Sequence, residues 1–162
     1  MRKALVCVVM SLSLILSAIL PAFAYDPIDY TDDTVTITYI GDGYYIVTEI
    51  SSDPIIQRSS SFTKTANKVV TVYNANDEIA CQYTLFGEFQ VVSGVSVVCT
   101  SATYTQNIYD TGWSFSNGQA TKSGATAYGV GKFTKKVLFI TTKEIEIDIS
   151  FTCDIYGNVT SE

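Results

Sequence analysis

Histidine is absent from this chain of 162 residues. Its absence excludes histidine-containing catalytic triads, histidine general bases and histidine-ligated zinc sites. The chain also lacks a Gly-rich phosphate-binding loop of either standard spacing and any Cys-x-x-Cys pair. We therefore expect no metal site and no cofactor.

Helical periodicity is missing as well. After residue 24, no stretch of helical length repeats apolar residues at i, i+3, i+4 and i+7. Thr, Val, Ile, Tyr and Phe are abundant instead, and these β-branched and aromatic residues suit the pleated surface of a sheet. The composition predicts an all-β protein.

The N-terminal segment 1–24 has the three parts of an export signal. Arg2 and Lys3 precede a nearly uninterrupted apolar stretch, which ends at Pro21 and the small-x-small sequence Ala22-Phe23-Ala24. The apolar run is almost long enough for an uncleaved membrane anchor, but the proline and the Ala-Phe-Ala ending favour cleavage. We expect a secreted, extracellular protein with no membrane attachment after cleavage.

The remaining chain is acidic. The formal net charge is −6, and it becomes −8 once Arg2 and Lys3 are removed. No basic run offsets this charge, which argues against nucleic acid and against anionic membrane surfaces as partners. Four aspartates fall within residues 25–33, but they lack the Asp-x-Asp-x-Asp-Gly spacing of a calcium loop, so we interpret this segment as a flexible acidic tail.

Residues 34–162 are expected to form one β domain, whose pattern is clearest in the run Lys143–Cys153. Apolar residues alternate there with acidic and hydroxyl residues, and Cys153 falls on the apolar parity. The same reasoning predicts further strands at 34–40, 44–50, 62–73, 79–91, 95–100, 111–116 and 124–130. Residues 116–118 are predicted as a turn, 132–136 as a basic turn, and Val137–Ile140 as the lead-in to the final strand.

Short strands punctuated by Gly and Asn are typical of antiparallel sandwiches and barrels. The fold class predicted is a single antiparallel β-sandwich, immunoglobulin-like or jelly-roll-like, with a barrel as the alternative. Trp113 lies between Cys99 and Cys153 in the chain, as in the Cys-Trp-Cys order of immunoglobulin domains. However, Phe151 stands where those domains carry the corner tyrosine.

Three cysteines follow the leader, so an exported chain should contain one disulfide and one free thiol. We favour a Cys99–Cys153 bridge, because both residues end well-patterned strands on the apolar parity; the closed loop would stabilise the fold by about 4 kcal/mol. Cys81 is then the free thiol and a small buried hydrophobe. The alternative role for Cys81 as a nucleophile lacks a histidine to activate it.

Two sets of side chains are candidates for binding or cleaving a glycan. Trp113 with Tyr104 and Tyr109 could form an exposed platform on which sugar rings stack; the alternative places Trp113 in the core. A glycosidase-type carboxylate pair could come from Glu144, Glu146 or Asp148, which share one strand face, although such a ladder is usually a solvated face. No residue is assigned a catalytic role.

Several short motifs resemble a group of small secreted proteins of unknown function from Clostridia-type Gram-positive bacteria. They are Gly43–Tyr45, Tyr83–Phe89, Cys99-Thr100, Tyr109–Trp113, and Cys153 with Gly157-Asn158. The resemblance implies the origin of the chain and a Cys99–Cys153 bridge, and it implies no activity.

The function predicted is therefore that of a secreted, non-catalytic β-sandwich with an extracellular interaction or structural role. Its partner would be an extracellular protein or a glycan. The alternatives are a carbohydrate-binding module that uses exposed Trp and Tyr side chains, and a glycan-active enzyme with a carboxylate pair.

Overall fold

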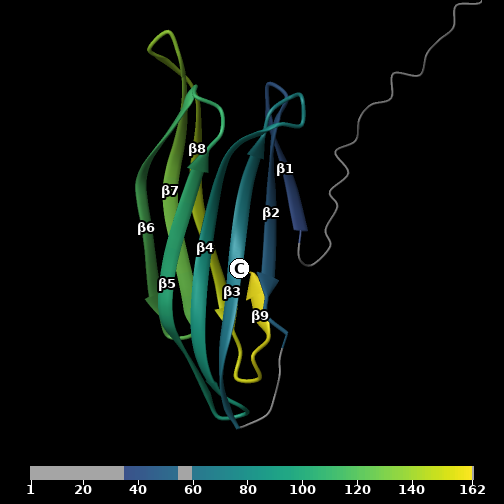
Figure 1. Cartoon of the computed structure of the whole chain (residues 1–162), viewed down its shortest axis with the longest axis vertical. Coiled ribbons are helices and arrows are strands. Elements are labelled where there is room, and N and C mark those ends of the chain that lie inside the picture. Colours follow the sequence, from purple (N-terminus) through teal and green to yellow (C-terminus); the bar gives the residue numbers. More distant parts are fainter. Residues whose placement is uncertain (1–34, 55–59, 162) are drawn as a thin grey trace, which may run out of the picture.

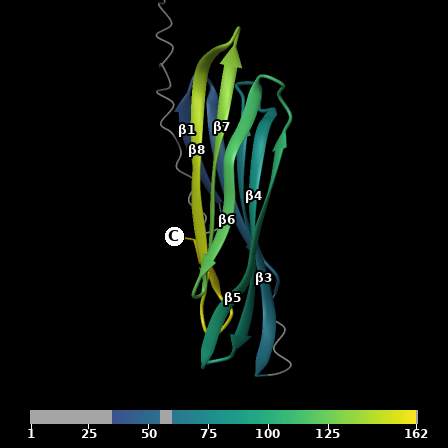
Figure 2. The ribbon, with the colours of Figure 1, turned by 90° about the vertical axis from the view of Figure 1, so that its left-hand side faces the viewer.

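A computed structural model of the chain describes residues 35–54 and 60–161. The predicted signal peptide 1–24 and the acidic segment 25–33 lie outside these ranges. The described residues form two antiparallel sheets that face each other as a β-sandwich (Figures 1 and 2). The strands follow the long axis of the molecule, and the turns gather at its two ends.

Each sheet contains strands that are consecutive in the chain. The first sheet has the order β1 (Val35–Gly41), β2 (Tyr44–Ser52), β3 (Ser61–Tyr73), β4 (Ile79–Val92) and β5 (Ser96–Ile108). The second has the order β6 (Trp113–Ser123), β7 (Thr126–Val137), β8 (Ile140–Cys153) and β9 (Val159–Ser161). The chain passes from one sheet to the other once, between β5 and β6.

This topology confirms the predicted sandwich and corrects its finer assignment. Immunoglobulin-like and jelly-roll-like sandwiches use Greek-key connections, in which strands that are not neighbours in the chain pair with each other. Here every strand pairs only with its neighbours in the chain, so each sheet is a meander. The alternative of a barrel was also wrong, because the strands divide into two separate sheets.

The core lies between the inward faces of the two sheets. As the alternation in 143–153 predicted, Ile145, Ile147, Phe151 and Cys153 are buried, and the acidic residues between them are exposed. The sheets approach closely where β4 carries Gly87: a Cβ atom there would lie 2.8 Å from the Phe151 ring. A side chain at this position would therefore force the two sheets apart.

Two lysines depart from the apolar pattern of the core. Lys64 and Lys68 lie on the inward face of β3, and each is almost fully buried. The Lys68 ammonium donates to the Ser150 carbonyl oxygen at 3.0 Å and to Ser161 Oγ at 2.6 Å. Burial lowers the pKa of Lys68. These contacts join β3 to β8 and β9 at the seam between the sheets.

Three boundaries predicted from the sequence were wrong. β5 continues to Ile108 instead of ending at residue 100, because its polar second half pairs with residues 81–88 of β4. Residues 116–118 form a bulge inside β6 and not a turn; Asn117 has a φ of 56°, and the register shifts between Ser116 and Gln119. The basic run 132–136 lies within β7, and the turn follows it.

Candidate functional site

The turn between β7 and β8 carries a continuous apolar surface, which we call the hairpin tip and which consists of Val137, Leu138, Phe139 and Ile140. Their exposed fractions are 49%, 86%, 99% and 69%, in that order. The tip reaches beyond the other turns at its end of the molecule (Figures 1 and 2). Four exposed apolar side chains in a row are unusual in a soluble protein and are typical of a contact surface.

The backbone of the hairpin tip is strained. Val137 pairs with Ile140, and the two residues between them have positive φ values, 48° at Leu138 and 69° at Phe139. Positive φ at both central residues is the signature of a type I′ turn, which strongly favours Asn-Gly. Leucine and phenylalanine in this conformation each cost about 1–2 kcal/mol. Neither the exposure nor the turn residues serve stability, which makes the tip a candidate for function.

Directly behind the tip, two lysines from the two strands of the hairpin hold one aromatic ring. Lys135 of β7 is the register partner of Lys143 of β8. Their ammonium nitrogens lie 4.8 Å and 5.1 Å from the centre of the Tyr44 ring, which belongs to β2. Cation–π attraction to the shared ring offsets the repulsion between the two like charges.

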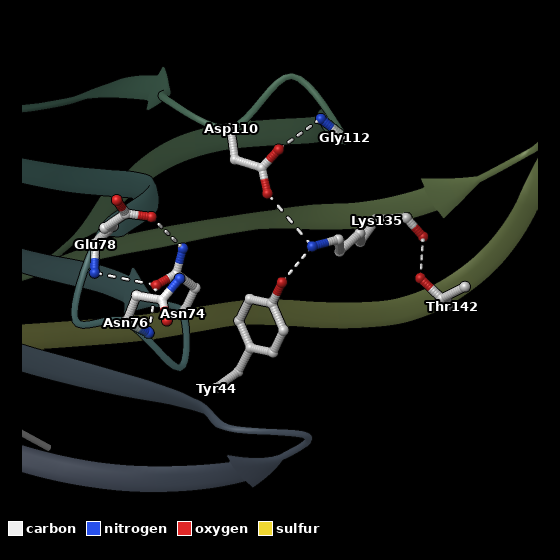
Figure 3. Close-up of polar contacts among 8 residues, drawn as sticks. All are labelled: Tyr44, Asn74, Asn76, Glu78, Asp110, Gly112, Lys135 and Thr142. Carbon is white, nitrogen blue, oxygen red and sulfur yellow. Dashed lines mark hydrogen bonds and ion pairs between the residues drawn. The ribbon is translucent and has the colours of Figure 1, made fainter.

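Each lysine also has an acidic partner. Lys135 donates to the Tyr44 hydroxyl and to Asp110 Oδ2, the latter at 3.3 Å (Figure 3). Lys143 donates to the Ile40 and Gly41 carbonyls at 3.0 and 2.9 Å and forms an ion pair with Asp42 at 3.2 Å. We call Tyr44, Asp110, Lys135 and Lys143 the hairpin base.

Contacts within and next to the hairpin base keep its Asp110 and Lys135 side chains charged. The backbone N–H of Gly112 donates to Asp110 Oδ1 at 2.9 Å and is the largest cause that lowers the pKa of Asp110; burial opposes it, and Lys135 adds to it. The hydrogen bond to Tyr44 raises the pKa of Lys135, burial opposes this, and Asp110 adds to it. Asp110 and Lys135 are therefore both charged at neutral pH.

Backbone contacts extend this anchoring up to the tip itself. The N–H of Lys136 donates to the Gly112 carbonyl at 3.0 Å. Within the hairpin, the side-chain Oγ1 of Thr142 on β8 donates to the Lys135 carbonyl of β7 at 3.3 Å and so joins the two strands (Figure 3). The hairpin is thus held to the body of the sandwich through residue 136, and the four apolar residues project beyond the last anchor.

The three aromatic residues predicted as a sugar platform lie in different environments. Trp113 is buried, with its ring edge-on to Tyr44 at a centroid distance of 5.8 Å. Tyr104 is half-buried and stacks on the buried Tyr83 at 5.3 Å. Only Tyr109 is well exposed, at 57%. The expected exposed platform is not formed, because the indole of Trp113 packs behind the hairpin base.

The three cysteines are buried and unpaired, so the expected Cys99–Cys153 disulfide is not present in this structure. Two of the thiols donate to nearby carbonyls: Cys99 to Ser101 at 3.3 Å, and Cys153 to Asp154 at 3.5 Å. Burial raises the pKa of Cys81 to about 12 and that of Cys153 to about 11. Because nucleophilic cysteines need a lowered pKa, these environments oppose the role considered for Cys81.

The acidic ladder of β8 lies on the outer face of its sheet, as expected. Glu144 and Glu146 both pair with Lys132 of β7, at 3.0 and 3.2 Å. The three acids alternate with the buried isoleucines and are exposed. Within residues 35–54 and 60–161, no group of three or more Cys, Asp or Glu side chains is arranged to hold a metal ion.

A shallow hollow of about 350 Å³ lies over the outer face of the first sheet. Phe86, which is 39% exposed, contributes the apolar part of its wall. Hydroxyl, amide and carboxylate side chains complete it, from Thr65, Asn67, Glu88, Ser101 and Thr103. An exposed aromatic ring among polar groups is the arrangement that sugar sites use.

Comparison with known proteins adds no relative. No family model, curated protein or solved structure matches the chain significantly. The resemblance to secreted clostridial proteins therefore stays a prediction. In the two described ranges, no helix has the length and apolar character needed to cross a membrane.

Proposed function

We propose that this chain is an exported, non-catalytic docking protein that binds its partner through the hairpin tip. The observation that carries the proposal is the exposure of four consecutive apolar side chains, Val137 to Ile140, at the end of a braced hairpin. Transfer of Leu138 and Phe139 from water into an apolar environment would contribute about 1.5–3 kcal/mol for each side chain.

The hairpin base supports this proposal because it limits the entropy lost on binding. A loop that must become ordered loses conformational freedom when its partner arrives. Here Lys135 and Lys143 fasten both strands to the body through Tyr44, Asp110 and Asp42. The two strands that carry the tip are therefore held in place before binding.

We also propose that the chain is exported from the cell. The leader features of residues 1–24 support secretion, and an extracellular location makes oxidation of cysteines favourable. We propose that Cys99 and Cys153 form a disulfide across the two sheets during export. Their places on β5 and β8, in the same core cluster, support this pairing.

The test of docking uses a variant that removes the apolar surface and keeps the turn. Leu138→Asn with Phe139→Gly installs the residues that a type I′ turn prefers. Val95→Ser is the matched control, because Val95 is 73% exposed on the β4–β5 turn, away from the hairpin tip. We expect the wild-type protein and the control to sediment with cell envelopes of the producing strain, and the double variant to stay in solution. Equal sedimentation of all three proteins would contradict the proposal.

A glycan is the second candidate partner, favoured by the hollow around Phe86. The ring would stack on a sugar, while Asn67 and Glu88 would bind its hydroxyl groups. Phe86→Ala, compared with Thr103→Ala as a milder change in the same hollow, tests this on a polysaccharide panel. Retention of the wild-type protein by one polysaccharide, lost in Phe86→Ala, would support a glycan; retention by none would remove this candidate.

A further inference from the structure

We infer that the hairpin tip inserts into the hydrocarbon region of a lipid bilayer. The inference rests on the proposed function and names the partner of the same site. It replaces the sequence-based expectation of no membrane attachment after cleavage. Four observations favour a bilayer over a protein groove: the side chains of the tip are apolar on every side, its backbone is nearly self-sufficient in hydrogen bonds, its depth is limited by lysines, and the charges around it are largely paired.

The distribution of the apolar side chains fits a partner that surrounds the tip. Val137 and Ile140 oppose each other across the hairpin and lie on one of its faces, and Leu138 and Phe139 occupy the turn. All four are exposed, and Phe139 is almost completely so. A groove in a protein covers one face of a strand or hairpin, whereas hydrocarbon covers the whole protrusion.

The backbone of the tip suits hydrocarbon as well. Unpaired N–H and C=O groups are costly inside a bilayer, because no water is there to bind them. Val137 and Ile140 are paired across the two strands, so only the two turn residues leave backbone groups without strand partners. A wider loop would carry more unpaired groups into the hydrocarbon.

The depth of insertion is limited by the residues directly behind the tip. Lys136 and its partner Thr141 come next along the two strands, and both are exposed. A long lysine stem can lie along apolar surface while its ammonium reaches the lipid headgroups. With a rise of about 3.3 Å per strand residue, the apolar segment penetrates roughly 5–10 Å, which is the depth of interfacial anchors.

The charges at this end of the molecule indicate a zwitterionic surface. Lys135 is paired with Asp110, and Lys143 with Asp42. The neighbouring β3–β4 turn adds Glu78, which accepts a hydrogen bond from Asn74 (Figure 3). With the exposed Lys136, three lysines lie near the tip, and the three carboxylates of Asp42, Glu78 and Asp110 balance their charge. No net positive surface therefore faces the membrane, and the acidic chain would be repelled by anionic lipids. Insertion should depend on the apolar tip and little on salt.

The experiment measures flotation of the processed protein, whose N-terminus is first established by intact mass, with protein-free phosphatidylcholine vesicles. The wild type and Val95→Ser should float with the vesicles. Leu138→Asn with Phe139→Gly should reduce the partition coefficient at least about tenfold, because two apolar side chains are lost. Raising the salt concentration, or replacing part of the lipid with phosphatidylglycerol, should not increase wild-type binding.

A tryptophan reporter gives an independent readout. Phe139→Trp should show a blue-shifted emission with phosphatidylcholine vesicles and quenching by brominated acyl chains, whereas Val95→Trp should show neither. Trp113 is buried and contributes a constant background in both proteins.

The outcomes separate this inference from the proposed function. Sedimentation of the wild type with producer envelopes through its tip, without binding to vesicles, would overturn the bilayer and leave docking to a protein partner. Equal vesicle binding by the wild type and the double variant would overturn the bilayer too, as would binding that needs phosphatidylglycerol and is released by salt. Failure in both assays would overturn both proposals.

Discussion

Cys99 and Cys153 donate their backbone N–H groups to adjacent carbonyls of the same turn: Cys99 to Gly124 at 2.8 Å and Cys153 to Ala125 at 3.0 Å. The β6–β7 turn thus brings one cysteine from each sheet to the same place in the core. Neither thiol is exposed in the folded protein, and burial raises the pKa of both.

From this relationship we predict a Cys99–Cys153 disulfide that forms before folding is complete, while the thiols are still accessible to the oxidant. In the reaction the two thiols lose two protons and two electrons to a disulfide oxidant, such as an oxidised thiol–disulfide oxidoreductase, which is reduced to its dithiol. Peptide mapping of the exported protein should show the bridge and leave Cys81 free. Loss of the bridge in Cys99→Ser with Cys153→Ser should lower the free energy of unfolding by about 4 kcal/mol.

Cys81→Ser is the control for the disulfide. It should leave the bridge between the other two cysteines intact. Alkylation of all three cysteines in the denatured, unreduced protein would show that the prediction is wrong.

The strain at the hairpin tip predicts a gain in stability when its apolar surface is removed. Leu138→Asn with Phe139→Gly relieves two unfavourable positive φ values, which is worth about 2–4 kcal/mol. The chain entropy that glycine loses on folding offsets roughly 1 kcal/mol of this, so the free energy of unfolding should rise by about 1–3 kcal/mol. Urea denaturation measures the change. A less stable double variant would mean that the apolar side chains stabilise the folded protein, and the functional interpretation of the tip would lose its main support.

Asp110 makes the hairpin base sensitive to acid. Its pKa is lowered in the folded protein by the Gly112 N–H and by Lys135, with burial opposing. A lowered pKa means that the stabilisation is fully present above the ordinary value of 3.8 and is lost as the pH falls through the folded value. The protection factors of hairpin amides, which correct each exchange rate for its intrinsic pH dependence, should therefore fall at acidic pH in the wild type.

Asp110→Asn removes this ion pair at every pH. The protection factors of its hairpin amides should be lower than in the wild type at neutral pH and should change less with acid. Identical acid profiles for the two proteins would assign the sensitivity to another carboxyl group, for example Asp154, whose pKa is also lowered.

Trp113 provides a direct test of the core assignment. The chain contains one tryptophan, so its fluorescence has a single source. Because the ring is 4% exposed, we expect a blue-shifted emission that acrylamide quenches poorly and that no polysaccharide alters. A red-shifted, readily quenched emission would instead indicate that Trp113 lies at the surface and would support the sugar platform.

Much of the sandwich was predictable from local alternation. One face of a half-buried strand must be apolar, so the pattern of residues 143–153 identified β8 and its inward residues correctly. The strands predicted at 34–40 and 44–50 likewise correspond to β1 and β2, and the turn between them has positive φ values at Gly41 and Gly43. These features depend on a few neighbouring residues, and they are therefore visible in the sequence.

The candidate site was missed because it breaks the usual rules for turns. Turns favour Gly, Asn and Asp, so the sequence pattern predicts Val137–Ile140 as the lead-in to the final strand and a turn on the lysines before it. One signal was present: four consecutive apolar residues do not fit the alternation of a strand with one wet face. The pairing of Lys135 with Lys143 shows where the chain reverses.

The sequence by itself determined the β class, the strand faces, the inward positions of the cysteines and the acidic outer ladder, because each follows from side-chain parity within one strand. Tertiary structure alone decided the meander order, the burial of Trp113 behind Tyr44 and the exposure of Phe139. Whether an aromatic ring is core or surface depends on what the other sheet places against it. Residues distant in the chain, such as Tyr44 and Lys135, make that choice through contacts that no local pattern encodes.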